Sequence, residues 1–268
     1  MTRTSCFAAV ILAAALGPAR AAAAAGVPDA EEIVRKSHQA FFSAGRDMRA
    51  KVSMRLVNKE AKERRRGLTM LRLNAEKGGR QKYYIHFHEP ADVRGTGFLI
   101  WKYPDRDDDR WLYIPAIHLV SRIAARDRHS SFVGSDFTYE DVSGRDLGLD
   151  SHRLLREETF DGADCYVVES VPKEESAFTR KVSWIGNKDF LPRKEEYYDA
   201  QKELFRVFTA EEIKDVGGVP TIVRRRMANL KTGHFTETVF ADTAYGVGLE
   251  DQLFTERYLR RPPKKWIK

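Results

Sequence analysis

The chain has 268 residues, a formal charge of +7 and two cysteines. Its 46 basic and 39 acidic residues are dispersed along the sequence. This distribution argues against a nucleic-acid-binding protein and is more compatible with attraction to anionic lipid headgroups. Two cysteines also exclude a disulfide-rich scaffold, so the fold must depend on an ordinary hydrophobic core.

Residues 1–25 have the pattern of a secretory signal peptide. A basic start precedes the apolar run Cys6–Leu16, which Gly17-Pro18 interrupts before a series of small residues. The apolar run is too short to span a membrane. We therefore predict cleavage within residues 21–25, export to the periplasm, and a single domain formed by residues 26–268.

The first element after this segment is predicted to be a helix. Asp29 can cap it, and Glu32 stands three residues later, as in a capping box. Small and apolar residues recur at helical spacing between Ala30 and Ala44, and Gly45 follows them. The helix therefore has one face that must pack against another part of the chain.

Most of the remaining sequence is predicted to form strands, because apolar residues alternate with polar ones between short turns. The dipeptide Asp161-Gly162 is a strong hairpin signal. Consecutive hairpins of this kind indicate an antiparallel meander. The expected strands are residues 49–58, 67–74, 81–89, 98–103, 110–114, 152–160, 165–171, 181–185, 191–200, 203–214, 219–229 and 234–245.

A sheet of this size must close into a barrel or have its concave face covered. Three segments could provide the cover: the N-terminal helix, residues 115–149, in which alternation is weak, and residues 250–259. The tail Arg260–Lys268 contains Pro262-Pro263 and is expected to be extended. The fold class predicted from these features is mainly β, with a few helices over a curved antiparallel sheet.

The sequence contains no convincing catalytic motif. His86 and His88 could share one face of a strand, but no third metal ligand lies near them, so polar strand histidines are the simpler interpretation. The acidic turn 105–109 lacks the ligand spacing of an EF-hand. Ser135 lies in Gly-Ser-Asp, which is not a hydrolase elbow. We predict no enzyme activity, no metal and no cofactor, and an exported hydrolase is the weakest hypothesis.

Aromatic residues concentrate in one third of the chain. They could fill a core or line a pocket for an acyl chain, and the sequence does not separate these alternatives. As candidate lipid-lining residues we single out Phe98, Trp101, Trp111, Tyr113, Phe132, Phe137 and Tyr139.

Two basic runs are candidates for contact with a headgroup or a protein partner. Arg64, Arg65 and Arg66 follow a mixed-charge turn between two expected strands, where a solvated hairpin tip is the alternative interpretation. In the run of residues 224–226, Arg225 must face opposite to its two neighbours if the segment is a strand. A cation on the inner face of a curved sheet would be costly without a partner or a ligand.

Several segments together resemble the outer-membrane lipoprotein-sorting (LolA-like) family. The resemblance rests on Gly97-Phe98-Leu99, Asp109–Pro115, Arg122-Ile123, Ser131-Phe132 with Gly134–Asp141, and Leu253–Leu259. It implies a strongly curved, incompletely closed antiparallel β-barrel with helices over its open face. The chain is longer than the chaperone that gives the family its name, so its cargo can differ.

The resemblance also implies a function. It predicts a periplasmic carrier that binds a lipid or the acyl chains of a lipoprotein, with an inner-membrane transporter or an outer-membrane acceptor as partner. The alternative is a non-catalytic envelope adaptor with a filled barrel, working with a membrane transporter or another protein. In either case we expect a monomer that binds no nucleic acid.

Overall fold

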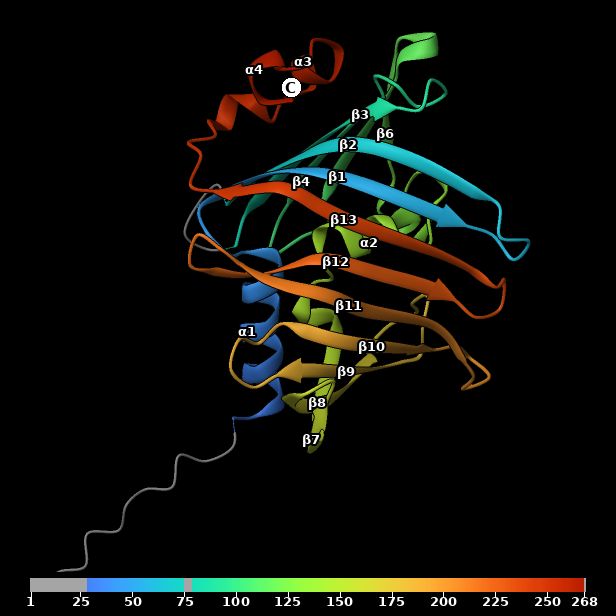
Figure 1. The fold of residues 1–268 in the computed structure, drawn as a ribbon, viewed down its shortest axis with the longest axis vertical. Coiled ribbons are helices and arrows are strands. Elements are labelled where there is room, and N and C mark those ends of the chain that lie inside the picture. Colours follow the sequence, from blue (N-terminus) through green and yellow to red (C-terminus); the bar gives the residue numbers. More distant parts are fainter. Residues whose placement is uncertain (1–27, 75–78, 268) are drawn as a thin grey trace, which may run out of the picture.

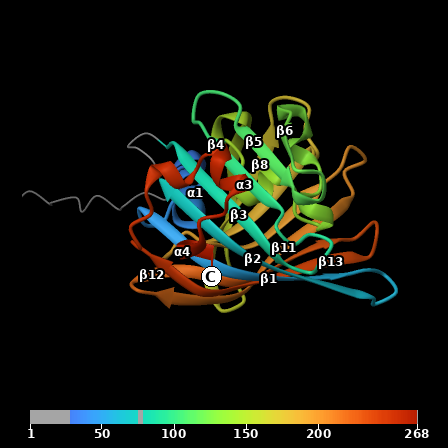
Figure 2. The ribbon, with the colours of Figure 1, turned by 90° about the horizontal axis from the view of Figure 1, so that it is seen from above.

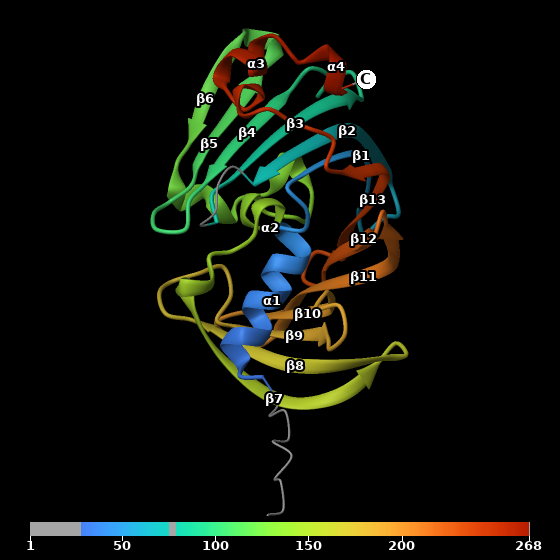
Figure 3. The ribbon, with the colours of Figure 1, turned by 90° about the vertical axis from the view of Figure 1, so that its left-hand side faces the viewer.

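The computed structural model describes residues 28–74 and 79–267, and the predicted signal peptide lies outside these residues. Within them, the chain forms one antiparallel sheet of 13 strands. The sheet is strongly curved, and Figure 3 shows it as an open C with helices inside and outside the curve. This is the mainly β, incompletely closed barrel that the sequence predicts.

The strands follow one another in space largely as they do in the chain (Figure 1). The spatial order across the described part of the sheet is β6-β5-β4-β3-β2-β1-β13-β12-β11-β10-β9-β8-β7. Their bounds are β1 Asp47–Val57, β2 Glu63–Asn74, β3 Gln81–Glu89, β4 Gly97–Lys102, β5 Asp109–Ile114, β6 Leu119–Ile123, β7 Asp150–Phe160, β8 Ala163–Pro172, β9 Arg180–Gly186, β10 Pro192–Tyr198, β11 Leu204–Val216, β12 Val219–Asn229 and β13 His234–Tyr245.

The hairpins predicted from the sequence are confirmed, whereas β6 was not predicted. Asp161 and Gly162 join β7 to β8 with φ values of 49° and 74°, the two positive values that a type I′ turn needs. Strand β6 has no fully buried residue. It therefore carries little of the apolar alternation by which a half-buried strand is recognised.

The order of the strands forces the chain to cross the concave face. Strands β6 and β7 are consecutive in sequence but form opposite edges of the sheet. The connection between them, residues 124–149, is named here the crossing segment. It contains η2 (Ala125–His129), η3 (Phe132–Gly134), α2 (Tyr139–Ser143) and η4 (Leu147–Leu149). Figure 3 shows it, with α2, inside the curve of the sheet.

Helix α1 (Ala30–Phe42) is the second cover of the concave face. Its predicted N-cap is confirmed, because the Asp29 carboxylate accepts a hydrogen bond of 2.7 Å from the backbone N–H of Glu32. Buried Ala30 and Ile33 pack against Val168 and Ile185 of the sheet. The apolar face predicted for this helix is therefore the face that meets the strands.

The C-terminal segment covers the opposite, convex face, which corrects the prediction for residues 250–259. It comprises η5 (Asp251–Leu253), α3 (Glu256–Arg260) and α4 (Lys264–Ile267), seen above β2 to β4 in Figure 2. The Tyr84 hydroxyl donates to the carbonyl of Tyr258, and Tyr84 points to the face opposite Tyr83 of the concave core. The tail is also partly helical through α4, rather than extended as expected.

Asp47 ties this C-terminal segment to the start of β1. Its carboxylate is buried and accepts backbone hydrogen bonds of 2.7, 3.1 and 3.1 Å from Val247, Gly248 and Leu249. These bonds satisfy three successive N–H groups at the point where the chain leaves β13. They thereby direct the chain from the concave core to the convex face.

We expect Asp47→Ala to lower the free energy of unfolding by about 2–4 kcal/mol, because three backbone donors lose a buried, charged acceptor. Urea denaturation measures the change. Asp107→Ala is the control, because the Asp107 side chain is 64% exposed and only pairs with Arg128 at 3.5 Å. That variant should change stability by no more than about 0.5 kcal/mol. Equal effects of the two substitutions would contradict the assigned role of Asp47.

Candidate ligand site on the concave face

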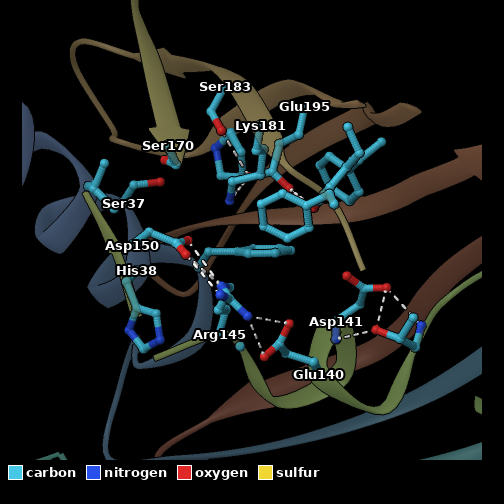
Figure 4. A pocket seen from close by; sticks show the side chains of 18 of the residues that line it. Ser37, His38, Glu140, Asp141, Arg145, Asp150, Ser170, Lys181, Ser183 and Glu195 are labelled. Atoms are coloured by element: carbon cyan, nitrogen blue, oxygen red, sulfur yellow. Dashed lines mark hydrogen bonds and ion pairs between the residues drawn. The ribbon is translucent and has the colours of Figure 1, made fainter. Parts of the chain in front are cut away.

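A cavity of about 100 Å³ lies between the concave face and its two covers. Helix α1 lines it on one side, the crossing segment on another, and strands β7 to β12 form its floor. One part of its wall is apolar and includes Val34, Phe41, Phe137, Phe208 and Met227. The other part is charged, and Figure 4 shows those side chains converging from the sheet and from both covers.

The two covers meet at Gly144, directly after α2. A Cβ atom added there would lie 3.0 Å from His38 Nε2 and 3.0 Å from Phe42 Cδ2, and Gly144 has a φ of 86°. Both the close approach and the backbone conformation favour glycine. Helix α1 and α2 therefore form a tight seam over the cavity, and the seam depends on the absence of a side chain at residue 144.

The crossing segment is fastened to the middle of the sheet. Thr138 and Asp141 form a capping box at the start of α2. Asp141 also accepts a hydrogen bond from Arg206 of β11. Asp136 is held by Thr236 of β13, through a backbone bond of 3.0 Å and a hydroxyl bond of 2.7 Å. The Gly-Ser-Asp-Phe-Thr-Tyr-Glu-Asp run noted in the sequence is therefore the part of the chain that anchors this cover.

Arg145 fixes the end of the crossing segment. It pairs with Glu140 of α2 at 3.1 Å and with Asp150 of β7 at 2.8 Å (Figure 4). Burial alone would lower the pKa of Arg145, but hydrogen bonds and charge interactions with these two carboxylates raise it. The guanidinium thus links the cover to the first strand that follows it.

A second, partly buried pair lies on the floor of the cavity. Lys181 Nζ is 2.9 Å from Glu195 Oε1, and the Tyr197 hydroxyl donates to Glu195 Oε2 at 2.7 Å. Burial would lower the pKa of Lys181, but the charge of Glu195 raises it. The pKa of Tyr197 lies well above its usual value because of burial and the nearby Glu195 charge. At neutral pH the floor of the cavity therefore holds the Lys181–Glu195 ion pair beside the neutral hydroxyl of Tyr197.

Arg225 is the exception among the cationic residues that line the cavity. Arg145, Lys181 and Arg206 each pair with a carboxylate. Arg225 has no hydrogen bond or ion pair to any described residue, and its Nε is buried without a partner. Arg225 faces inward, whereas Arg224 pairs with Glu211 on the other face. The sequence predicts that these two neighbours face opposite ways, but it does not say which of them faces inward.

Three of the lining residues are histidines, and burial lowers the pKa of each. The effect is largest at His38, whose pKa falls to about 4 because of burial and then the charges of Lys102 and Lys181. Its Nε2 has no hydrogen-bond partner among the described residues. His38 is therefore neutral at pH 7 and sits directly at the seam between the two covers.

The structure does not bring the predicted aromatic lining residues to one site. Phe137 lines the cavity. Phe98, Phe132 and Tyr139 pack together in the neighbouring concave core, with Phe98 stacked on Tyr139 at 5.1 Å between ring centroids. The remaining three lie on the convex face beneath the C-terminal helices, namely Trp101, Trp111 and Tyr113.

The predicted basic residues are also separated. Arg64 and Arg65 are exposed on the β1–β2 hairpin, and Arg65 pairs with Glu63 at 3.3 Å. Arg66 is buried and donates a hydrogen bond to the carbonyl of Val133 in the crossing segment. Of this predicted set only Arg225 reaches the cavity.

Sequence reasoning missed most of the charged lining. Asp141 and Arg206 are 65 residues apart, and Lys181 and Glu195 belong to different strands. No local spacing marks such pairs. One signal was available for the aromatic residues: Phe98 and Trp101 are three apart on one strand and so must point to opposite faces.

No helix among the described residues is long and apolar enough to cross a membrane.

Comparisons with known proteins agree with the observed fold. A family model described as "Uncharacterized protein" matches residues 79–261. A crystal structure of a DUF1329 family protein from Desulfovibrio piger is 29% identical with a TM-score of 0.79, and the match covers 85% of this chain and 97% of that one. A search of curated proteins gives no significant match.

Two further crystal structures share this fold. A domain from Vibrio parahaemolyticus, named for outer-membrane lipoprotein sorting, is 31% identical with a TM-score of 0.80 over 87% of this chain and 98% of that one. A LolA superfamily protein from Nitrosomonas europaea is 22% identical with a TM-score of 0.68, covering 87% and 100% of the two chains. The latter similarity concerns the fold alone.

The low pKa of His38 predicts acid sensitivity. Between pH 6.5 and about 4 the unfolded chain protonates this histidine while the folded chain does not. Protonation therefore favours unfolding. As the pH falls through that range, the free energy of unfolding decreases by at most about 1.4 kcal/mol per pH unit for one histidine.

Urea denaturation at pH 7 and pH 5 tests this expectation. His38→Gln should lose less stability on acidification than the unaltered protein. His234→Gln is the control, because His234 is exposed at the first position of β13. An unchanged acid response in His38→Gln would show that His38 is not a source of the effect.

Proposed function

The chain belongs to the LolA-like outer-membrane lipoprotein-sorting family, and from this premise we propose that it carries an acyl chain of a lipid or lipoprotein. The acyl chain of this cargo would be held on the concave face of the sheet, beneath α1 and the crossing segment. The observation that supports this proposal is the cavity enclosed between two covers and an apolar wall. A carrier needs such an enclosed apolar space, because burial of each methylene contributes about 0.8 kcal/mol.

Binding of a complete acyl chain requires the covers to move. The cavity of about 100 Å³ is smaller than an engineered apolar cavity of roughly 150 Å³ that accepts benzene. The seam at Gly144 is the natural place to open, because α1 and α2 touch there but are not joined by a hydrogen bond or ion pair within the described residues. Loading would separate α1 from the crossing segment and extend the cavity along the sheet.

The predicted signal peptide supports a location in the periplasm. In that compartment the cargo would come from an inner-membrane transporter and pass to an outer-membrane acceptor. Release would require an acceptor of comparable apolarity, because the burial that drives loading also opposes unloading. A carrier of this kind performs no chemistry on its cargo, and we propose no catalytic residue.

A second candidate function is a non-catalytic adaptor that binds a protein partner of the envelope. Two observations favour it. The closed cavity is small. Ile117, shortly before the edge strand β6, and Leu119, its first residue, are 64% and 46% exposed. Exposed apolar side chains next to a sheet edge suit a protein contact. Absence of any bound or acquired lipid would favour this function over the carrier.

Two aromatic truncations test the carrier proposal. Phe137→Ala should weaken the binding of a fluorescent fatty acid by tenfold or more, since loss of a buried aromatic contact costs about 1.5–3 kcal/mol. Trp111→Ala is the matched control, because Trp111 packs on the convex face against Trp101. It should leave binding unchanged if the protein remains folded.

The reverse result would contradict the proposed site. If Trp111→Ala abolishes fatty acid binding while Phe137→Ala retains it, the cargo binds on the convex face. Circular dichroism melting of both variants distinguishes loss of binding from loss of the fold.

A further inference from the structure

Arg225 occupies an unusual position inside the protein. Its guanidinium carbon lies 4.5 Å from the ring centroid of Phe240, 5.1 Å from that of Phe41 and 5.6 Å from that of Phe137. These rings come from strand β13, helix α1 and the crossing segment. The cation therefore stands where the sheet and both of its covers meet.

Phenylalanine rings do not satisfy the hydrogen-bonding capacity of a guanidinium. They attract the cation through their faces, but an arginine has five N–H donors and a ring offers no oxygen to accept them. Arg225 Nε is buried without an acceptor among the described residues. Burial lowers the pKa of Arg225 to about 10, with the charges of Asp141 and Tyr83 opposing this effect, so the side chain is still a cation at neutral pH.

The nearby carboxylates are engaged elsewhere. Asp141 binds Arg206, as well as the backbone N–H and hydroxyl of Thr138. Glu195 binds Lys181 and Tyr197. The other cations that line the cavity therefore each pair with a carboxylate, whereas no described residue forms an ion pair with Arg225.

Arg225 also lines two cavities at once. One is the cavity of about 100 Å³ beneath the seam. The other, of about 50 Å³, lies against β1, β2, β12 and β13 and has apolar walls that include Met48, Met70 and Ile222. A small anionic group placed at Arg225 would leave an attached hydrocarbon chain beside apolar surface.

We propose that Arg225 binds the anionic group, a carboxylate or a phosphate, of an amphiphilic ligand whose chain lies on the concave face. This inference rests on the proposed carrier function and narrows its cargo to acidic amphiphiles. The oxygens of the ligand accept hydrogen bonds from the unpaired N–H groups of Arg225. Phe41, Phe137 and Phe240 exclude water from this contact between the guanidinium and the anionic group. Charge-assisted bonds in such a dry setting are stronger than neutral ones.

Calorimetric titration with three probes tests the proposal: laurate, dodecan-1-ol and inorganic phosphate. Laurate and dodecan-1-ol have the same chain length but differ in the charge of the head. We expect the unaltered protein to bind laurate about 10- to 100-fold more tightly than dodecan-1-ol. Arg225→Met should abolish this preference by weakening laurate binding, while dodecan-1-ol binding is retained and confirms that the variant folds.

Arg226→Met is the matched control. Arg226 is the next residue of the same strand, stands 3.7 Å from the ring centroid of Phe235 and also has a buried, unpartnered Nε. It faces away from the cavity, so this variant should keep the preference for laurate. Loss of the preference in Arg226→Met would overturn the assignment to Arg225.

The outcomes separate this inference from the carrier function. Equal binding of laurate and dodecan-1-ol by the unaltered protein would overturn the inference and leave the carrier in place. Binding of phosphate alone, lost in Arg225→Met, would support an anion site and count against the carrier. Binding of none of the three probes would contradict both.

Discussion

The connection between the two edges of the sheet is the constraint on which the rest of the structure depends. Strands β6 and β7 follow each other in sequence and lie at opposite edges of the described sheet. The 124–149 segment must therefore traverse the concave face, and a segment in that position must satisfy its backbone groups internally or from the sheet. The capping box of Thr138 and Asp141 satisfies backbone N–H groups at the start of α2, and Thr236 accepts a hydrogen bond from the backbone N–H of Asp136. Arg206 holds the same segment through the side chain of Asp141. The cover over the site is thus a consequence of the strand order.

The interior beneath this cover combines apolar packing with a nearly balanced set of charges. Buried ion pairs contribute little net stability, but removal of one partner leaves a costly charge. Such pairs hold the crossing segment in one register over the sheet through Arg145 and Arg206. Among the described residues, α1 meets the end of α2 where its own His38 and Phe42 pack against Gly144, without a hydrogen bond or ion pair. The crossing segment is thus held on the sheet by charged bonds, whereas its contact with α1 is made by packing alone.

The sheet was largely predictable from the sequence, whereas the site was not. Alternation of apolar residues and the Asp161-Gly162 turn indicate the strands directly, and the Asp29 cap indicates α1. The exposed strand β6 carries no such pattern. The position of the C-terminal helices depends on tertiary bonds such as those of Asp47, which no local signal encodes. Alternation shows that Arg225 and Arg224 face opposite ways, but only the curvature of the sheet decides which one is enclosed.

Native mass spectrometry of the protein purified from a bacterial periplasm tests the central claim most directly. The claim is that the concave face holds an acyl chain beneath α1 and the crossing segment. We expect a reproducible additional mass at about one molecule per protein, identified as a lipid after solvent extraction. An unliganded mass, together with no uptake of a fluorescent fatty acid, would contradict the carrier function.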